Sequence, residues 1–181
     1  PLGGLLILKP TRIFRDQRGF FHESYNQKVF KGLGITNNFV QDNHSMSYRG
    51  VLRGFHFQLG ENAQCKLTRV VEGNVLDVVV DMRLDSPTFG QWYGVELSDK
   101  NMWQLYVPAG FAHAVCCMSD KAHLCYKVDK FHVSGAERGL CPIDPCVGVK
   151  WPFGEDKLIM SDKDRNQPSF ETLVAELKGM S

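Results

Sequence analysis

A histidine between two phenylalanines is the first feature of this sequence that could do chemistry. His56 lies in residues 51–58, which also contain Arg53 and Gln58. An imidazole, with an ordinary pKa of about 6.5, exchanges a proton near neutral pH, and a guanidinium group binds anions. Because valine and phenylalanine favour strands, we expect these residues on a stiff β-strand. The segment indicates proton transfer on an anionic substrate, with a hydrogen-bonded structural histidine as the alternative.

Polar side chains also gather in three other segments. The candidates are Arg18 and Glu23 in residues 16–23, Gln41, Asn43 and Ser47 in residues 41–47, and Lys66 at the start of a later run. A plain β-sandwich would have apolar residues at several of these positions. A surface loop or a solvated lysine is an equally ordinary explanation for each segment. Their place in the fold therefore decides whether they contribute to a site.

The composition excludes several classes of protein. The chain has 181 residues with 21 basic and 20 acidic side chains, so its net charge of +1 gives no field that would attract nucleic acid or an anionic membrane. Its longest apolar runs are far shorter than the roughly 20 residues of a membrane span, and its first nine residues resemble a strand more than a secretion signal. Six cysteines show no C-x-x-C pair. We expect a soluble, cytoplasmic protein with reduced thiols.

Short β-like runs separated by glycine, proline, asparagine and aspartate predict an all-β fold. These runs are residues 5–8, 19–25, 38–41, 51–58, 66–72, 74–81, 91–97, 103–107, 112–117 and 123–128. So many strands at close spacing are typical of an antiparallel sandwich or barrel. A helical pattern follows Ser169 and ends near Lys178, and a weaker one covers residues 27–31. Nothing in the composition marks a linker, so we predict one domain spanning residues 1–181.

A double-sheet jelly roll encloses a cavity, and the period of two along each strand decides which side chains enter it. Alternation in residues 51–58 places Arg53 on the face of the two phenylalanines, and His56 and Gln58 on the opposite face. A bend or bulge at Gly54 would redirect Arg53. We therefore expect His56 and Gln58 to line one cavity.

Several ordered motifs resemble those of one family. They are Asp16-x-Arg18-Gly19-Phe20-Phe21-x-Glu23, Gln41-Asp42-Asn43-x-Ser45-x-Ser47, Val51-Leu52-Arg53-Gly54-Phe55-His56-Phe57-Gln58, Ser86-Pro87-Thr88-Phe89-Gly90, Pro108-x-Gly110-Phe111-Ala112-His113, Trp151-Pro152 and Ser161-x-Lys163-Asp164. From about Arg12 to Asp164 the chain resembles the dTDP-4-dehydrorhamnose 3,5-epimerases. The resemblance implies a cupin jelly roll that epimerises a nucleotide-linked 4-keto-6-deoxyhexose without metal or other cofactor.

The resemblance also implies roles for individual residues. His56 would remove a proton alpha to the 4-keto group, Asp164 would orient it, and Lys66 would stabilise the enolate oxygen. The implied substrate contacts are Arg18 and Arg53 on the diphosphate, and Glu23, Gln41, Asn43 and Ser47 around the sugar and nucleotide, with Gln58 and His113 lining the cavity. The family further implies a homodimer in which N-terminal strands pair across the interface.

The chain departs from the family pattern at the acid. In the family this acid is a tyrosine, and the spacing from Tyr126 and from Glu137 assigns its position to His132. Double epimerisation needs a proton delivered from the face opposite the base. Three outcomes follow: His132 donates and both C3 and C5 invert, only C3 inverts, or the chain binds sugar nucleotides without turnover.

A metal-binding cupin that uses His56, His113 and a carboxylate is the alternative from another class. Metal cupins resemble one another in having a His-x-His pair within one strand. Here Gly54 and Gln58 occupy the positions two residues before and after His56. The sequence therefore favours the metal-free epimerase.

Overall fold

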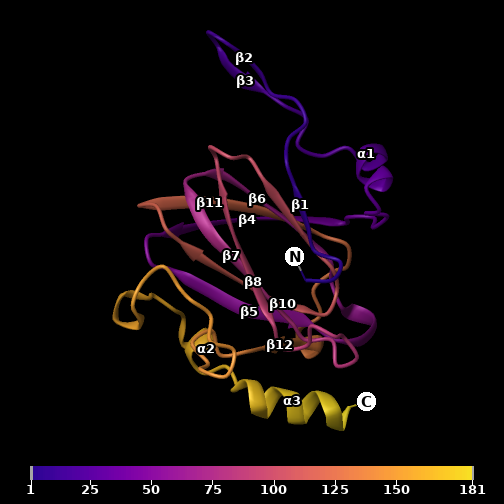
Figure 1. Ribbon diagram of the computed structural model, residues 1–181, viewed down its shortest axis with the longest axis vertical. Helices are drawn as coiled ribbons and strands as arrows, with labels where there is room; N and C mark the ends of the chain where they lie inside the picture. The colour runs from indigo at the N-terminus through magenta and orange to yellow at the C-terminus, as the bar shows by residue number, and fades with distance from the viewer. Residues whose placement is uncertain (1, 181) are drawn as a thin grey trace.

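Two five-stranded sheets form the body of the protein. The computed structural model describes residues 2–180 (Figure 1). The first sheet has the order β1 (Leu6–Leu8), β9 (Gln104–Val107), β6 (Lys66–Glu72), β11 (Lys121–Val128) and β4 (Gln41–Tyr48). The second has the order β12 (Glu137–Gly139), β5 (Leu52–Gln58), β10 (Phe111–Cys117), β7 (Asn74–Asp81) and β8 (Trp92–Ser98). All pairs of neighbouring strands are antiparallel, which confirms the predicted all-β sandwich.

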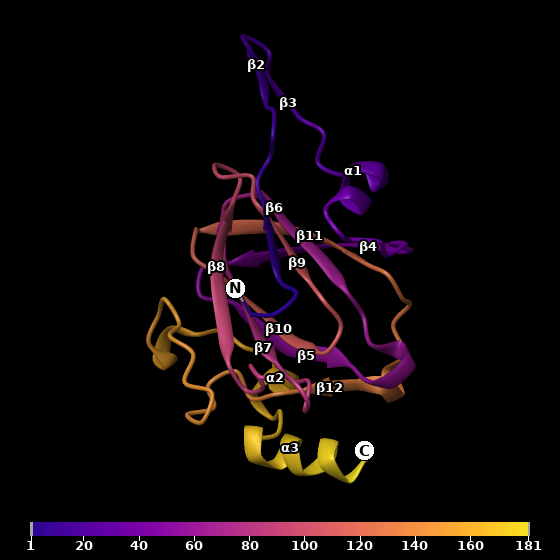
Figure 2. The same ribbon diagram turned by 45° about the vertical axis from the view of Figure 1, so that its right-hand side comes forward.

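One apolar core lies between the two sheets. Val70, Leu105 and Leu124 from the first sheet pack in one cluster with Val79 and Leu97 from the second. The two sheets are seen edge-on as separate layers in Figure 2. Apolar side chains from both inner faces exclude water here, and this burial is the main stabilising term of a sandwich. The core does not fill the whole interior, because polar residues take the inward positions at the other end.

A second core covers the outer face of the second sheet. Helix α3 (Phe170–Gly179), capped by the Ser169 side chain, packs there through Leu173 and Leu177. The chain before it contributes further apolar contacts and contains the short helices η3 (Glu155–Lys157) and α2 (Asp162–Arg165). The predicted C-terminal helix is confirmed. This covering fixes the C-terminal segment, and with it Asp164, beside β5.

An N-terminal hairpin stands away from the sandwich. Strands β2 (Phe14–Asp16) and β3 (Gly19–Phe21) pair only with each other, and Figures 1 and 2 show them beyond the end of both sheets. The weakly predicted helix is present as α1 (Gln27–Gly32), where the Asn26 side chain accepts hydrogen bonds from the first turn. The hairpin carries exposed aromatic side chains, including Phe20 and Phe21.

The largest error in the predicted elements concerns residues 38–47. The strand predicted at 38–41 instead begins at Gln41 and continues to Tyr48 as β4, through the segment that also fitted a surface loop. Its side chains alternate strictly between half-buried and exposed. The inward positions are polar because they line cavities, so the strand lacks the apolar period by which strands are recognised. Helices η1 (Gly60–Asn62) and η2 (Ser134–Ala136) and strand β12 were also not predicted.

Among residues 2–180 no helix is both long and apolar enough to cross a membrane. All six cysteines are free thiols, and Cys65, Cys116 and Cys117 are buried. These three thiols therefore serve as small core residues.

Candidate active site

A bulge in β5 brings Arg53 and His56 to the same face. His56 pairs with His113 on β10, and Arg53 pairs with Val115, so two residues of β5 lie opposite one residue of β10. Gly54 lies within the bulge with a φ of 118°, a conformation that favours glycine. A Cβ atom at this position would also lie 2.5 Å from the His113 carbonyl oxygen. The predicted bulge is confirmed.

The bulge separates the polar from the apolar side chains of β5. Leu52, Phe55 and Phe57 enter the core beneath α3, while Arg53 and His56 line a cavity between the sheets. The simple alternation that placed Arg53 with the phenylalanines is therefore wrong, because one extra residue inverts the facing of the strand.

Two adjoining cavities share the side chains of His56, Lys66 and Tyr126. The arginine cavity, of about 330 Å³, is further lined by Ser45, Ser47, Arg53, Val75, His113, Val115, Ala122, Leu124, Ser161, Lys163 and Asp164. The amide cavity, of about 250 Å³, is further lined by Gln41, Asn43, Phe57, Gln58, Gln64, Val128, His132 and Glu137. Most predicted site residues therefore meet at one end of the sandwich.

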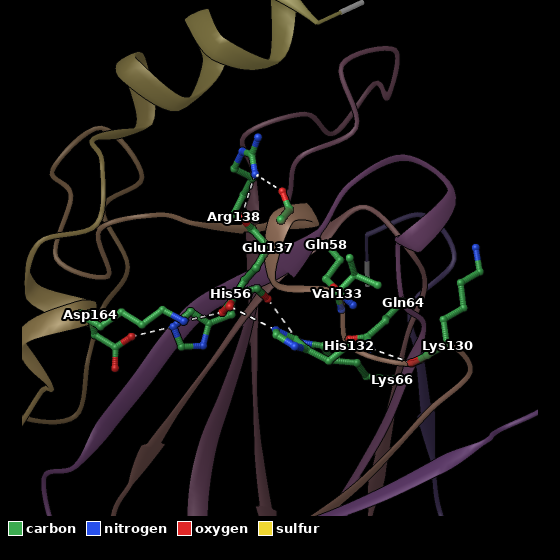
Figure 3. A network of polar contacts seen from close by, with 12 residues as sticks. His56, Gln58, Gln64, Lys66, Lys130, His132, Val133, Glu137, Arg138 and Asp164 are labelled. Atoms are coloured by element: carbon green, nitrogen blue, oxygen red, sulfur yellow. Dashed lines mark hydrogen bonds and ion pairs between the residues drawn. The ribbon is translucent and has the colours of Figure 1, made fainter.

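His56 is paired with a buried carboxylate. Its Nε2 lies 2.7 Å from Oδ1 of Asp164, whose Oδ2 accepts a hydrogen bond from the Ser161 hydroxyl at 2.9 Å (Figure 3). Ser161 also caps α2 through the Asp164 backbone N–H, so the carboxylate is held on both sides. Donation of Nε2–H to Asp164 leaves Nδ1 as the proton acceptor. Burial lowers the pKa of His56, and the nearby Asp164 offsets this only in part. The imidazole is therefore a neutral base near pH 7.

Lys66 supplies a buried cation beside this base. Its Nζ donates to the His56 carbonyl oxygen at 3.2 Å. Burial lowers the pKa of Lys66 to about 8, although Asp77 and Glu137 act to raise it. The ammonium group thus stays charged at neutral pH in surroundings where charge is poorly screened. A cation placed this way stabilises an oxyanion more strongly than one in water.

A second histidine–carboxylate pair lies on the neighbouring strands. His113 Nε2 is 2.7 Å from Oδ1 of Asp77, and Asp77 Oδ2 accepts from the Thr68 hydroxyl at 2.9 Å. Asp77 and Thr68 are completely buried. His113 therefore lines the arginine cavity, as predicted, from a more enclosed position than His56.

The predicted binding residues on β4 and β5 hold one another in place. Arg53 donates from Nε to the Ser47 hydroxyl at 2.9 Å and from a terminal nitrogen to the Met46 carbonyl oxygen at 3.2 Å. Gln41 Nε2 donates to Asn43 Oδ1 at 2.8 Å, which leaves the Asn43 amide nitrogen for other partners. These contacts preorganise a guanidinium group in one cavity and two amides in the other.

Within one chain, Arg18 and Glu23 do not line either cavity. Arg18 is on the projecting hairpin, 84% exposed, and pairs with Asp16. Glu23 accepts a hydrogen bond from Asn26 at 3.1 Å. Neither residue contacts His56 or Lys66 in this arrangement.

His132 lies at the amide cavity, so the altered loop has kept this position near the site. Its Nε2 is 3.2 Å from Glu137 Oε2, and its side chain is 53% exposed. Glu137 Oε1 in turn accepts from Lys163 at 2.7 Å. Burial raises the pKa of Glu137, but Lys163 and His132 more than offset it, and the net shift is downward. Glu137 is thus an ionised link between the loop and α2.

The sequence-based reasoning missed Tyr126 and Glu137 as site residues. Tyr126 on β11 lines both cavities and faces β5 from the opposite sheet. Burial raises the pKa of its phenol, against a smaller opposing effect of Arg53. Alternation with the inward-facing Leu124 and Val128 could have revealed Tyr126. Glu137 had no comparable signal, because it begins the short strand β12, which the sequence did not predict.

No group of three or more histidine, cysteine, aspartate or glutamate side chains within residues 2–180 could hold a metal ion. His56 and His113 each turn Nε2 to a separate carboxylate, rather than to a common point.

Comparison with known proteins identifies the family. The family model described as dTDP-4-dehydrorhamnose 3,5-epimerase matches residues 1–172. The chain belongs to this family. The dTDP-4-dehydrorhamnose 3,5-epimerase of Shigella flexneri is 50% identical over 92% of this chain and 91% of its own.

Solved structures of this epimerase family have the same fold. The dTDP-6-deoxy-D-glucose-3,5-epimerase of Legionella pneumophila, in complex with dTDP-4-keto-L-rhamnose, is 44% identical with a TM-score of 0.90, covering 96% of this chain and 91% of that one. A 3′-monoepimerase of Streptomyces bikiniensis, in complex with dTDP-quinovose, is 32% identical with a TM-score of 0.89, covering 99% and 89%. The predicted family, its cupin jelly roll and the enzyme class of isomerase are confirmed.

Proposed function

We propose that the protein inverts C3 and then C5 of a dTDP-linked 4-keto-6-deoxyhexose. The observation that carries this proposal is the His56–Asp164 pair, held beside the buried Lys66 ammonium where the two cavities meet. A base and a cation at this spacing suit removal of a proton alpha to a ketone. The names of the Shigella and Legionella relatives include both carbon positions, which supports the double inversion.

His56 acts as the base in this mechanism. Its Nδ1 accepts the proton from the carbon next to the 4-keto group, and the two electrons of the C–H bond form the enolate double bond. Asp164 holds the ring through Nε2 and stabilises the imidazolium ion that results. The negative charge that develops on the 4-oxygen is stabilised by the Lys66 ammonium group. Because this interaction strengthens as charge develops, it lowers the barrier to enolisation.

The acid must act from the side opposite the base. Tyr126 meets this requirement because it lies on the first sheet, whereas His56 lies on the second. His132 reaches the same amide cavity from the loop. We propose that Tyr126 delivers the proton at one carbon and that His132, beside Glu137, supports delivery at the other. A phenol with a raised pKa keeps its proton until the enolate forms.

The arginine cavity suits the diphosphate and the amide cavity suits the sugar. Arg53 and Lys163 both line the arginine cavity, and guanidinium and ammonium groups pair with phosphate oxygens. Gln41 and Asn43 present amides to neutral hydroxyl groups in the amide cavity. In this proposal the reactive ring lies between His56 and Tyr126.

We infer a homodimer in which Arg18 and Glu23 serve the site of the other copy. The projecting hairpin exposes Arg18 together with Phe14, Phe20 and Phe21, and aromatic side chains are typical of interfaces. Mixing inactive Arg18→Ala and His56→Ala proteins tests the inference. A hybrid dimer would contain one intact site and recover part of the wild-type activity, whereas a monomeric mass with no recovery would contradict it.

Two further expectations rest on the same proposal. Residues 1–181 act as one domain, because α3 packs on the sheet that carries His56. The protein works in the cytoplasm, where six free thiols stay reduced.

Incubation with dTDP-4-keto-6-deoxyglucose in deuterated water tests the proposed reaction. We expect deuterium at C3 and at C5, because each inversion exchanges one carbon-bound proton with solvent. Label at C3 alone would make the protein a 3-epimerase, like the Streptomyces bikiniensis relative by name. Label at neither carbon, with the nucleotide sugar still bound, would contradict catalysis.

Substitution of the two proposed acids, Tyr126 and His132, tests which carbon each one protonates. Tyr126→Phe removes a proton donor without changing shape, so it should slow exchange at its carbon by about 10²–10⁴-fold. His132→Tyr restores the residue that the family has here and should change C5 exchange by less than about tenfold, because a phenol is also a proton donor. Equal slowing of both carbons by Tyr126→Phe would contradict the division of roles. The measurement is the rate of label entry at each carbon by NMR.

A further inference from the structure

The side-chain amide of Gln58 is buried, and its nitrogen has no hydrogen-bond partner. Its side chain is 3% exposed, and within residues 2–180 its Nε2 is one of two buried side-chain atoms without a hydrogen-bond partner. An unpaired amide donor in the interior costs free energy of about 1–3 kcal/mol. Gln58 lines the amide cavity, where a bound molecule could satisfy that donor.

The orientation of the amide is fixed by the chain next to His132. Gln58 Oε1 accepts a hydrogen bond from the Val133 backbone N–H at 2.7 Å. A backbone N–H cannot accept a hydrogen bond, so the end facing Val133 must be the oxygen, and Nε2 must be the other end. Figure 3 shows Gln58 beside Val133, with His56, Lys66 and His132 in the same network. The free N–H group of Gln58 is therefore a donor for a ligand.

The surroundings indicate a neutral oxygen as the acceptor. Glu137 lines the same cavity and is ionised, so a diphosphate there would meet like charge. The amides of Gln41 and Asn43 on this wall suit hydroxyl and carbonyl oxygens, and the remaining polar side chains include Tyr126 and the proposed catalytic His56, Lys66 and His132. Phosphate oxygens have Arg53 and Lys163 in the other cavity. The acceptor for Gln58 is thus an oxygen of the sugar ring or its substituents.

We propose that the side chain of Gln58 both recognises the sugar and positions His132. Its amide nitrogen donates to a hydroxyl or carbonyl oxygen of the bound hexose, while its oxygen holds the backbone directly after His132. The end of β5 supports the same segment, because the Leu59 N–H donates to the Ala136 carbonyl oxygen at 3.0 Å. Binding of the correct sugar thereby stabilises the loop that carries His132. This inference rests on the proposed function of the site and specifies its recognition of the sugar.

Binding measurements test the contact with the sugar without turnover. The affinity of dTDP and of dTDP-quinovose is measured by calorimetry for the wild type and for Gln58→Met. The variant should bind dTDP-quinovose about fivefold to tenfold more weakly, the usual effect of losing one neutral hydrogen bond, and should bind dTDP as the wild type does. Equal affinity changes for both ligands, or no change for either, would overturn the proposal.

A second variant separates the role of the Gln58 amide nitrogen from that of its oxygen. Gln58→Glu keeps an acceptor for the Val133 N–H and removes the donor, so it should lose affinity for the sugar but keep the wild-type ratio of C5 to C3 exchange. Gln58→Met loses both ends, and its C5 to C3 ratio should change by about threefold or more, since misplacement of a reacting group is costly. If Gln58→Met fails to fold, the ratio of the dTDP affinity to the dTDP-quinovose affinity, measured for Gln58→Glu, still tests the contact between Gln58 and the sugar.

Gln64→Met is the matched control. Gln64 is an amide of the same cavity, but its Nε2 already donates to the Lys130 carbonyl oxygen at 2.7 Å. Its substitution should leave the ratio of dTDP to dTDP-quinovose affinity as in the wild type, and a change as large as that of Gln58→Met would contradict a specific role for Gln58. Loss of solvent exchange in the wild type would refute the proposed function alone, since the binding ratios do not depend on turnover.

Discussion

Two histidine–carboxylate pairs lie side by side on β5 and β10 and have the same geometry. His56 and His113 are register partners, and each holds Nε2 at 2.7 Å from an aspartate oxygen. They differ in access, because the His56 side chain is 32% exposed and that of His113 is 8% exposed. They also differ in origin, because Asp77 comes from the neighbouring strand β7 and Asp164 from the distant helix α2.

This difference supports the separate tasks that we propose for the two pairs. A buried pair on adjacent strands satisfies its own polar groups and supports packing. A pair that opens onto a cavity, with its carboxylate delivered by a separate segment, has a free imidazole nitrogen for a substrate. The proximity of two identical pairs shows that the residue types alone do not define a catalytic base. The two histidines both line the arginine cavity, and they differ in exposure, which is greater for His56 than for His113.

Exchanging each aspartate for asparagine should separate catalysis from stability. Asp164→Asn should lower kcat by about a thousandfold, because the wrong imidazole tautomer would face the substrate. Asp77→Asn should lower kcat far less but reduce the free energy of unfolding by about 2–3 kcal/mol, since it disrupts a completely buried pair. Steady-state kinetics and chemical denaturation measure the two effects. A larger loss of kcat from Asp77→Asn would reverse the assignment.

Lys66 should show a trade between activity and stability. Lys66→Met should lower kcat by about a hundredfold or more through loss of the oxyanion partner. Because the folded state lowers the pKa of Lys66 to about 8, charging this residue opposes folding at neutral pH. The same variant should therefore be more stable than the wild type by about 1–2 kcal/mol. Thermal unfolding at pH 7 measures this, and a destabilised variant would show that Lys66 is well solvated or paired.

The dependence of kcat/KM on pH should distinguish the two aspartates, because substitution of each one should shift a different side of the profile. On the acid side kcat/KM should fall about tenfold per pH unit below the pKa of His56, which burial holds under the usual 6.5. On the alkaline side it should fall above pH 8, where Lys66 loses its proton. Asp164→Asn should shift the acid limb to lower pH, because that carboxylate raises the pKa of His56.

Asp77→Asn should instead shift the alkaline limb to lower pH, because Asp77 raises the pKa of Lys66. It should leave the acid limb in place. Movement of the acid limb in Asp77→Asn would contradict the assignment of that limb to His56.

The strand that carries His56 and its bulge could be predicted from the sequence because both depend on local features. Phenylalanines around His56 define the strand, and Gly54 supplies the conformation that the bulge requires. Asp164 lies 108 residues from His56, and only the family resemblance connected them. Strand β4 was partly missed because its inward side chains are polar, which removes the apolar period.

The pairing of side chains within the site had no sequence signal. The direction of the Gln58 amide depends on the Val133 backbone, and the link from His132 through Glu137 to Lys163 depends on how a loop meets α2. The exclusion of Arg18 from the site of its own chain follows from the projection of β2 and β3. These features arise from tertiary placement, which residue types and spacing do not encode.

The central claim is that His56, and not its neighbour His113, removes the proton. Deuterium entry at C3 of dTDP-4-keto-6-deoxyglucose, measured by NMR for His56→Ala and His113→Ala under identical conditions, tests it most directly. We predict that His56→Ala abolishes label at C3 while His113→Ala retains it at a reduced rate. Retained label at C3 in folded, nucleotide-binding His56→Ala would contradict the account.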